Sequence, residues 1–235
     1  MTRRYFVPEL QSTGGTITLP DAESQHAIRV MRIKVGDAIE LFNGKGLQSD
    51  AVVTQVDRNH CICESQAPQL IDREPAKKVR MGIALPKPDR AKELIERLTE
   101  LGIHHVTPIV AERTQRGPTE SSLDKLRKVI IEGCKQSGRN HLLEIGRTTK
   151  SHDYFQQESS QTKLIAHVSE NGISPLSFLN GPESETISVA IGPEGGWTET
   201  EYELAVKNGF ASVNLGKRIY RIETASVSLA SIFVT

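Results

Sequence analysis

From about residue 79 onward, strand-like segments alternate with helical segments along the chain. Short apolar segments predict strands at 79–85, 106–110, 163–167, 187–191 and 213–215, and amphipathic periodicity predicts helices at 89–101, 123–136, 198–208 and from about 224. A helix between two strands returns the chain to the same end of the sheet, so the strands run parallel and helices cover both faces. The expected fold class of this part is therefore α/β with a parallel sheet.

The first seventy residues follow a different pattern. Short segments rich in β-branched or aromatic residues, separated by turn residues, predict strands at 3–7, 15–19, 38–43, 49–57 and 60–64. Many short strands at this spacing predict a small β-barrel, interrupted by one helix with Asp21 as its expected N-cap. The aperiodic, proline-containing stretch Ala67 to Lys78 predicts the boundary between a domain at 1–72 and a domain at 73–235.

Two glycine-containing runs lie in the last third of the chain, IGPEGG (Ile191 to Gly196) and LGKRIYRIETA (Leu215 to Ala225). Each run follows a predicted strand and leads into a predicted helix. Glycine just past a strand end permits a tight turn or the close approach of a ligand. Two such loops in succession predict one binding site at the carboxyl ends of neighbouring strands. The first run does not match G-x-G-x-x-G, and the chain has no Walker motif, which disfavours ordinary nucleotide cofactors.

The second run carries four charged residues within seven positions: Lys217, Arg218, Arg221 and Glu223. Arginine suits a phosphate or carboxylate partner because its planar fork donates two parallel hydrogen bonds. An ion pair of Arg221 with Glu223 or with Glu194 is the structural alternative to a role in binding. The pattern leaves both interpretations open.

The remaining candidates predict structure rather than chemistry. Cys61 and Cys63 share one face of a predicted strand, and Cys134 supplies only a third thiol, so no zinc set forms and no metal is expected. His104 and His105 have no partners for a catalytic triad nearby. Trp197, the only tryptophan, follows the first glycine run and is expected to be a packing anchor.

Charge and hydropathy narrow the class of protein. The 29 basic and 29 acidic side chains cancel, which argues against a protein that grips nucleic acid by charge alone. Residues 81–150 nevertheless carry 13 basic and nine acidic groups, and such a region could bind a polyanion. No apolar run is long enough to span a membrane, and three cysteines without a secretion signal predict a cytoplasmic protein.

Several motifs together resemble one known family. IGPEGG before a capped helix and LG-x-RI-x-R-x-ETA near the C-terminus resemble the SPOUT methyltransferases, in particular the RsmE family of 16S rRNA uracil-N3 methyltransferases. The resemblance spans the whole chain, because four further segments also resemble that family: RRYFV (Arg3 to Val7), HAIRVMRIKVGDAIELFNGKG (His26 to Gly46), ERTQR (Glu112 to Arg116) and IIEGCKQSGRN (Ile130 to Asn140).

The resemblance implies a fold and an activity that the patterns alone do not predict. It implies a PUA-like β-barrel that presents RNA and a SPOUT domain whose parallel sheet contains a deep trefoil knot. It further implies a homodimer that transfers a methyl group from S-adenosylmethionine to N3 of a uridine near the 3′ end of 16S rRNA, within the small ribosomal subunit, leaving S-adenosylhomocysteine.

The resemblance also assigns roles to individual residues. The first knot loop would lie near Ala166 to Val168. Arg113, Gln136, Arg139 and Arg221 would face the cleft, and the residues expected to take part in catalysis are Arg221, Arg139, Glu223 and Arg113. Those expected to bind the cofactor are Ala166, His167, Ile191, Gly192, Glu194, Gly195, Gly196, Leu215, Gly216, Ile219, Tyr220, Arg221, Thr224 and Ala225. Those expected to contact the RNA backbone are Arg3, Arg4, Arg29 and Arg32.

The chain departs from the family pattern at three positions. Tyr220 stands where leucine is usual, Lys135 where glutamate is common, and Thr114 where serine is frequent. A side chain of Tyr220 that turned inward would alter the adenine pocket. Two alternative functions remain: another SPOUT RNA methyltransferase that acts on a ribose 2′-hydroxyl or a different base, and a non-catalytic RNA-binding protein.

Overall fold

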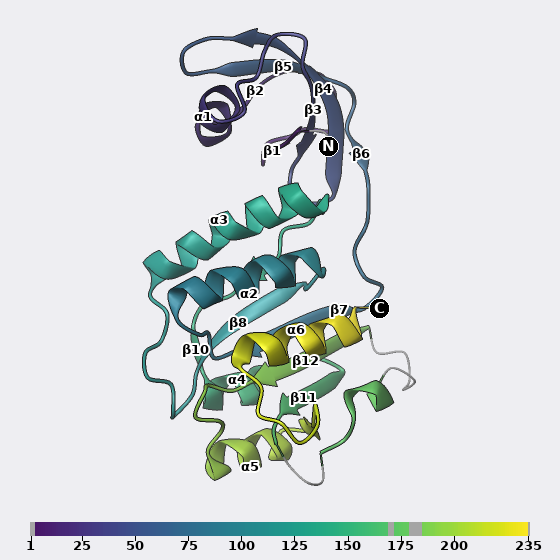
Figure 1. Ribbon diagram of the computed structural model, residues 1–235. Helices are drawn as coiled ribbons and strands as arrows, with labels where there is room; N and C mark the ends of the chain where they lie inside the picture. Colours follow the sequence, from purple (N-terminus) through teal and green to yellow (C-terminus); the bar gives the residue numbers. More distant parts are fainter. Residues whose placement is uncertain (1–2, 169–171, 179–184, 235) are drawn as a thin grey trace. The chain divides into compact units, whose positions relative to one another are not determined.

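The computed structural model describes residues 3–168, 172–178 and 185–234 (Figure 1). It divides into two compact units, the first formed by Met1–Glu74 with Ile131–Leu142 and the second by Pro75–Ile130 with Leu143–Thr235. The sequence-based division into 1–72 and 73–235 assigns residues 131–142 to the second domain. In the structure the contacts of these residues group them with the first unit.

The first unit is a mixed sheet of short strands with one helix. Its strands are β1 (Arg3–Phe6), β2 (Gly15–Thr18), β3 (Ala38–Phe42), β4 (Leu47–Val56), β5 (Cys61–Ser65) and β6 (Gln69–Leu70). The order is β1-β3-β4-β5-β2 with β6 paired to β4; β1 and β3 run parallel, and the other pairs are antiparallel. One apolar core contains Tyr5 of β1 and Cys63 of β5, with Ile17 of β2 packed against it. The sheet thus encloses a single core, as the predicted barrel requires.

The helix of this unit, α1 (Asp21–Arg29), begins one residue earlier than its predicted cap implies. The N-cap is Pro20 rather than Asp21, and no side chain caps the first turn. Asp21 and Glu23 instead lie inside the first turn, where negative charge complements the helix dipole. The hydroxyl of Ser24 donates to the carbonyl of Leu19 at 2.9 Å and fixes the start of the helix against the strand before it.

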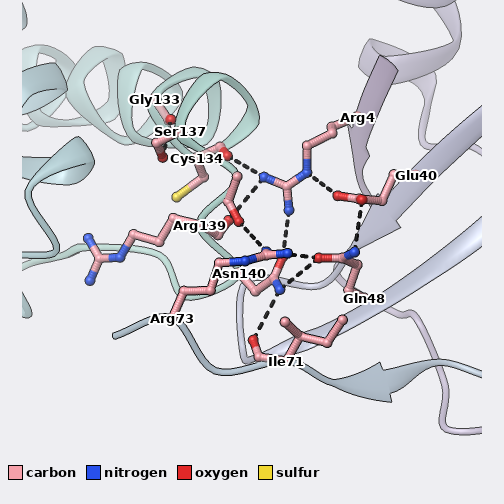
Figure 2. Close-up of polar contacts among 11 residues, drawn as sticks. Arg4, Glu40, Gln48, Ile71, Arg73, Gly133, Cys134, Ser137, Arg139 and Asn140 are labelled. Atoms are coloured by element: carbon pink, nitrogen blue, oxygen red, sulfur yellow. Dashed lines mark hydrogen bonds and ion pairs between the residues drawn. The ribbon is translucent and has the colours of Figure 1, made fainter. Parts of the chain in front are cut away.

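Residues 131–142 belong to the first unit because the sheet binds them through a polar network (Figure 2). Arg4 pairs with Glu40 through Nε, donates at 2.5 Å to the carbonyl of Cys134, and donates at 2.5 Å to Oδ1 of Asn140. The Asn140 amide donates in turn to Oε1 of Gln48 at 3.0 Å. These contacts join the end of α3 (Glu120–Ser137) and the residues after it to β1, β3 and β4.

The second unit is an α/β layer structure. Its strands are β7 (Lys78–Ile83), β8 (His105–Val110), β9 (Glu144–Ile145), β10 (Thr149–Lys150), β11 (Thr162–Ala166), β12 (Thr186–Ile191) and β13 (Ala211–Val213). Its helices, besides the first part of α3, are α2 (Pro88–Glu100), α4 (Ser151–Gln157), α5 (Glu199–Lys207), α6 (Ile222–Phe233) and a 3₁₀ turn at Pro175–Phe178. The order is β10-β8-β7-β12-β11-β13, with β9 beside β8, and every pairing between these strands is parallel. This confirms the predicted parallel sheet.

Helices cover both faces of this sheet. Figure 1 shows α2 and α6 side by side on one face, and α6 is in contact with α2, β7 and β12. On the opposite face, the hydroxyl of Tyr154 in α4 lies 2.6 Å from that of Ser188 in β12, and Ala190 of the same strand packs in a core with Phe155 and Phe210. Alternate residues of a strand face opposite sides, so Val189, between them, faces the layer of α2 and α6.

Several short elements escape the sequence-based prediction, among them β9, β10 and α4. The strands β9 and β10 have two residues each, and α4 has seven, so none is long enough to show a period. Predicted boundaries also shift slightly, since α3 begins at Glu120 and α6 at Ile222. By contrast, α5 starts with the predicted capping box of Thr198 and Glu201, and Gly209 follows its end with a φ of 85°.

Candidate functional site at the carboxyl edge of the parallel sheet

Three loops meet at one edge of the second sheet. The strands β12, β11 and β13 are consecutive neighbours and run parallel, so their carboxyl ends lie together. The first loop follows Ala166 at the end of β11, the second (192–198) leads from β12 to α5, and the third (214–221) leads from β13 to α6. The structure therefore places both glycine runs at the same edge of the sheet, on either side of the end of β11.

Trp197 joins the first loop to the second. Its indole Nε1 donates to the carbonyl of Ala166 at 3.2 Å, and its side chain is only 4% exposed. The indole lies so close to Gly192 that a Cβ at this glycine would be 3.0 Å from the ring. On its other side the ring contacts Phe155 edge-on, with centroids 5.3 Å apart. Trp197 is the predicted packing anchor, and it also links two loops, which the sequence did not indicate.

Arg113 holds the second loop from the segment that follows β8. Its Nη1 donates to the carbonyls of Gly195 at 2.8 Å and Trp197 at 3.2 Å. The preceding residue, Glu112, donates its amide to Oε1 of Glu201 at 3.0 Å, while Oε2 of Glu201 accepts from the amide of Thr198 in the capping box. Glu112, Arg113 and the start of α5 thus fix the shape of the glycine loop between them.

The third loop is closed by its own side chains. The amide of Gly216, which has a φ of 110°, donates to Oδ1 of Asn214 at 2.7 Å. The hydroxyl of Tyr220 donates to the carbonyl of Leu215 at 3.4 Å, so Tyr220 turns back onto its own loop. Ile219 is 87% exposed at the tip. A Cβ added at Gly216, or at Gly196 in the second loop, would meet nothing within 4 Å, so both glycines border open space.

Unpaired polar groups gather where α6 begins. Arg221 is its exposed N-cap and forms no ion pair within the described parts of the chain, so the alternatives that pair it with Glu223 or Glu194 are wrong. Glu223 instead pairs through Oε1 with Arg90 of α2 at 3.3 Å. Its other oxygen, Oε2, is buried without a hydrogen-bond partner. Sequence reasoning missed Arg90 as a site residue, although its place in the first turn of α2, the helix that follows the carboxyl end of β7, could have indicated it.

The other residues expected to bind the cofactor line the same edge with varied exposure. His167 is half-buried and stacks on Tyr202 of α5, with ring centroids 4.5 Å apart. Ile191 is buried at the end of β12, Glu194 and Thr224 are exposed, and Ala225 is half-buried. The structure therefore brings all the predicted cofactor residues to the three loops and to the first turn of α6.

Two arginines with predicted roles in RNA binding or catalysis are instead committed within the first unit. The side chain of Arg4 is 7% exposed and is used up by Glu40, Asn140 and a backbone carbonyl, which corrects its expected role as an RNA contact. The side chain of Arg139 is likewise buried, at 5% exposed, and it donates to both oxygens of Glu74, at 2.8 and 2.5 Å. Its fork is thus engaged by a carboxylate of the chain itself rather than open to a substrate.

Arg29, the last residue of α1, and Arg32, which follows the helix, are exposed, and Arg3 is half-exposed beside Asp37 at 2.7 Å. Two apolar side chains in the same segment, Val30 and Val35, are 65% and 64% exposed. The three cations that stay accessible therefore lie on the first unit beside apolar surface. Gln136, expected to face the cleft, is exposed near the end of α3.

The two other departures from the family pattern have simple structural roles. Lys135 is buried and bridges Glu23 at 2.7 Å and Glu132 at 2.8 Å. Burial raises the pKa of Glu23, whereas the Lys135 ammonium lowers it. Thr114 accepts a hydrogen bond from the amide of Ala111 through its hydroxyl at 2.9 Å, as a serine would.

The cysteines show no sign of reactivity. All three are free and buried, and burial raises the pKa of Cys63 to about 12 and that of Cys134 to about 11. A thiol with a raised pKa is a poor nucleophile and a poor metal ligand at neutral pH. Over the described ranges, three or more metal-binding side chains nowhere come together. Nor does any helix in those ranges have the length and apolar character to cross a membrane.

Comparisons with known proteins agree with this arrangement. A family model described as the RNA methyltransferase domain matches residues 73–234, and one described as the RNA methyltransferase PUA domain matches residues 19–64. The two units are thus those of an RNA methyltransferase. Ribosomal RNA small subunit methyltransferase E of Synechocystis sp. is 31% identical over 99% of this chain and 77% of its own length. The chain belongs to the ribosomal RNA small subunit methyltransferase E family.

Solved structures support the same assignment. The ribosomal RNA small subunit methyltransferase E of Neisseria gonorrhoeae, bound to S-adenosyl methionine, superimposes with a TM-score of 0.90 at 30% identity, covering 98% of this chain and 96% of that one. A Legionella pneumophila chain in complex with the cofactor SAM gives a TM-score of 0.90 at 26% identity, covering 99% and 97%.

Proposed function

We propose that this chain transfers a methyl group from S-adenosylmethionine to N3 of a uridine near the 3′ end of 16S rRNA. The observation that carries the proposal is the meeting of three loops at one sheet edge, with open space over Gly196 and Gly216. Two similar chains have been solved with this cofactor bound. The proposal includes the SPOUT topology with a trefoil knot through these loops, and a homodimer as the active form.

The residues of the edge suit this cofactor. Gly196 and Gly216 keep the backbone of the second and third loops uncovered, so amides and carbonyls there can reach an adenine and a ribose. The buried hydroxyl of Ser226, in the first part of α6, has no hydrogen-bond partner among the residues that the structure describes. A polar group of the cofactor would satisfy it. S-adenosylmethionine supplies an electrophilic methyl group on a sulfonium when bound.

Two side chains of α6 would then act on the uracil. N3 carries a proton in the resting base, and Oε2 of Glu223 would accept it while Arg90 holds Oε1. Arg221, exposed and without an ion pair to any residue that the structure describes, would donate to a uracil carbonyl oxygen and stabilise the anion that forms. Because N3 lies on the Watson–Crick edge, the target base must be unpaired when it reacts.

The RNA would bind through the first unit as well. Arg3, Arg29 and Arg32 are the accessible cations among the predicted contacts, and they would meet phosphates rather than bases. A net charge of zero gives little non-specific attraction to RNA. We therefore propose the assembled small subunit as the substrate, and methylation of free 16S rRNA at the same rate would contradict this.

The decisive test is nucleoside mass spectrometry of 16S rRNA from cells with and without this protein. Loss of 3-methyluridine alone, restored by the purified protein and S-adenosylmethionine, is the expected result. Loss of a 2′-O-methyl mark or of another methylated base would instead indicate a different SPOUT activity. An unchanged set of nucleosides, together with no calorimetric binding of S-adenosylmethionine, would indicate a non-catalytic RNA-binding protein.

A graded substitution at Gly195 tests the position of the cofactor site. A Cβ there would lie 3.2 Å from Cβ of Arg113, so alanine requires a small shift, whereas the branched side chain of valine must displace Arg113. We expect Gly195→Val to weaken S-adenosylmethionine binding by about 100-fold or more, equivalent to about 2.7 kcal/mol, and Gly195→Ala by less than about tenfold. Calorimetry measures both; unchanged affinity in the valine variant would place the cofactor elsewhere.

A further inference from the structure

We infer that Trp197 and Arg113 form a positioning pair that holds the first and second loops together and thereby sets the affinity for the cofactor. Neither residue acts on the transferred methyl group. The inference rests on the proposed function for its ligand, but the linkage between the loops stands on hydrogen bonds within this chain. It changes the role expected for Arg113 from catalysis to positioning.

The tryptophan half of the pair connects two strand ends. Its Nε1 reaches the carbonyl of Ala166, the last residue of β11, and its ring covers Gly192, the first residue after β12. The ring is anchored from behind by Phe155, which is fully buried. Since Gly192 has no side chain, the indole can lie directly against its backbone, and the distance between the two loops is fixed.

The arginine half fixes the remainder of the second loop. Within the loop, the amide of Gly196 donates to the carbonyl of Pro193 at 2.8 Å and closes a turn. The carbonyls of Gly195 and Trp197 both accept from the same nitrogen of Arg113. A guanidinium on two carbonyls forms charge-assisted bonds, which are stronger than neutral ones. Arg113 therefore holds the turn that borders the open space, through the carbonyl of Gly195 and also through that of Trp197.

This arrangement explains why the pair would act on affinity. A loop that is already held in its binding conformation loses little conformational freedom when a ligand arrives, so less of the interaction energy is consumed by ordering. With one hydrogen bond of the pair removed, the first loop and the second loop can move independently. The cofactor would then bind more weakly, while its methyl group, once bound, would meet the same groups of α6.

The test measures cofactor binding and turnover in four variants, and tryptophan fluorescence in the three that keep Trp197. Trp197→Phe keeps an aromatic ring but removes the donor to Ala166 and part of the indole surface against Gly192. Arg113→Met removes the donor to both carbonyls, and Arg113→Lys restores a cation in its place. Arg116→Gln is the matched control, because Arg116 is an exposed cation of the same segment.

We expect the dissociation constant of S-adenosylmethionine to rise about fivefold in Trp197→Phe and about 10- to 100-fold in Arg113→Met, on the scale of one to two lost hydrogen bonds. Arg113→Lys should recover part of the loss, and Arg116→Gln should stay within about twofold of the wild type. At saturating cofactor, kcat should stay within about threefold in all four variants. A large fall in kcat with an unchanged dissociation constant in Arg113→Met would overturn the inference and make Arg113 catalytic.

A readout without cofactor separates this inference from the proposed function. Trp197 is the only tryptophan, so the intrinsic emission of the protein reports on this pair alone. Arg113→Met should shift that emission or change its quenching by iodide, and Arg116→Gln should not. If the wild type bound no S-adenosylmethionine, the proposed function would fail, but the fluorescence measurement would still test whether Arg113 and Trp197 hold the loops together. Unchanged emission in Arg113→Met would contradict that inference. Should Trp197→Phe fail to fold, the exposed Arg113 still carries the test.

Discussion

Replacing Glu223 by glutamine is expected to lower the rate of methyl transfer by about 10²- to 10⁴-fold, the range that general-base catalysis contributes. Glutamine has the same shape but cannot accept the N3 proton. The carboxylate is suited to this role because Arg90 holds one oxygen at 3.3 Å and leaves the other buried and unpartnered. The measurement is kcat at saturating S-adenosylmethionine with small subunits as substrate.

Two further variants make the result for Glu223 specific. Arg90→Met keeps the carboxylate but releases its orientation, so we expect an intermediate loss of about tenfold in kcat. Glu203→Gln removes an exposed carboxylate of α5 and should leave kcat unchanged. The dissociation constant of S-adenosylmethionine should change by less than about threefold in Glu223→Gln. Nearly full turnover in Glu223→Gln would show that a water molecule or another group takes the proton.

Much of the second unit could be predicted because its local patterns agree with its tertiary structure. Helices of nine or more residues with a regular apolar face were found, and the capping box of Thr198 and Glu201 marked the start of α5 correctly. The parallel order of the strands then placed both glycine runs at one edge without knowledge of any contact. The two-residue strands and the seven-residue α4 could not be found, since pairing with neighbours rather than local periodicity forms them.

The partners of charged side chains were the part that sequence could not supply. Arg4 and Arg139 resemble surface cations in the sequence. In the structure Glu40 and Glu74 pair with them and offset the free-energy cost of burying their charges. Arg90 lies 133 positions from Glu223, and no local spacing connects them. Trp197 was predicted correctly as buried, but its hydrogen bond to Ala166 depends on the pairing of β11 with β12.

Replacing Arg4 by methionine is expected to lower the free energy of unfolding of the first unit by about 3–5 kcal/mol, the cost of removing one partner of a buried ion pair. The side chains of Arg4 and Glu40 are 7% and 17% exposed, so water does not screen the loss. The change leaves Glu40 uncompensated and deprives Asn140 and the carbonyl of Cys134 of their donor (Figure 2). It also removes the guanidinium that stacks 4.6 Å from the ring centroid of Phe42.

A matched variant and two optical probes localise the effect of Arg4. Arg3→Met breaks the pair with Asp37, whose side chains are each 35% exposed, and should cost less than about 1 kcal/mol. Denaturation followed by far-ultraviolet circular dichroism reports both units, whereas Trp197 fluorescence reports the second unit. Arg4→Met should therefore move the circular dichroism transition more than the fluorescence transition. If Arg4→Met stayed within about 1 kcal/mol of the wild type, backbone pairing such as that between Gly46 and Asn140 at 3.0 Å would suffice to hold residues 131–142.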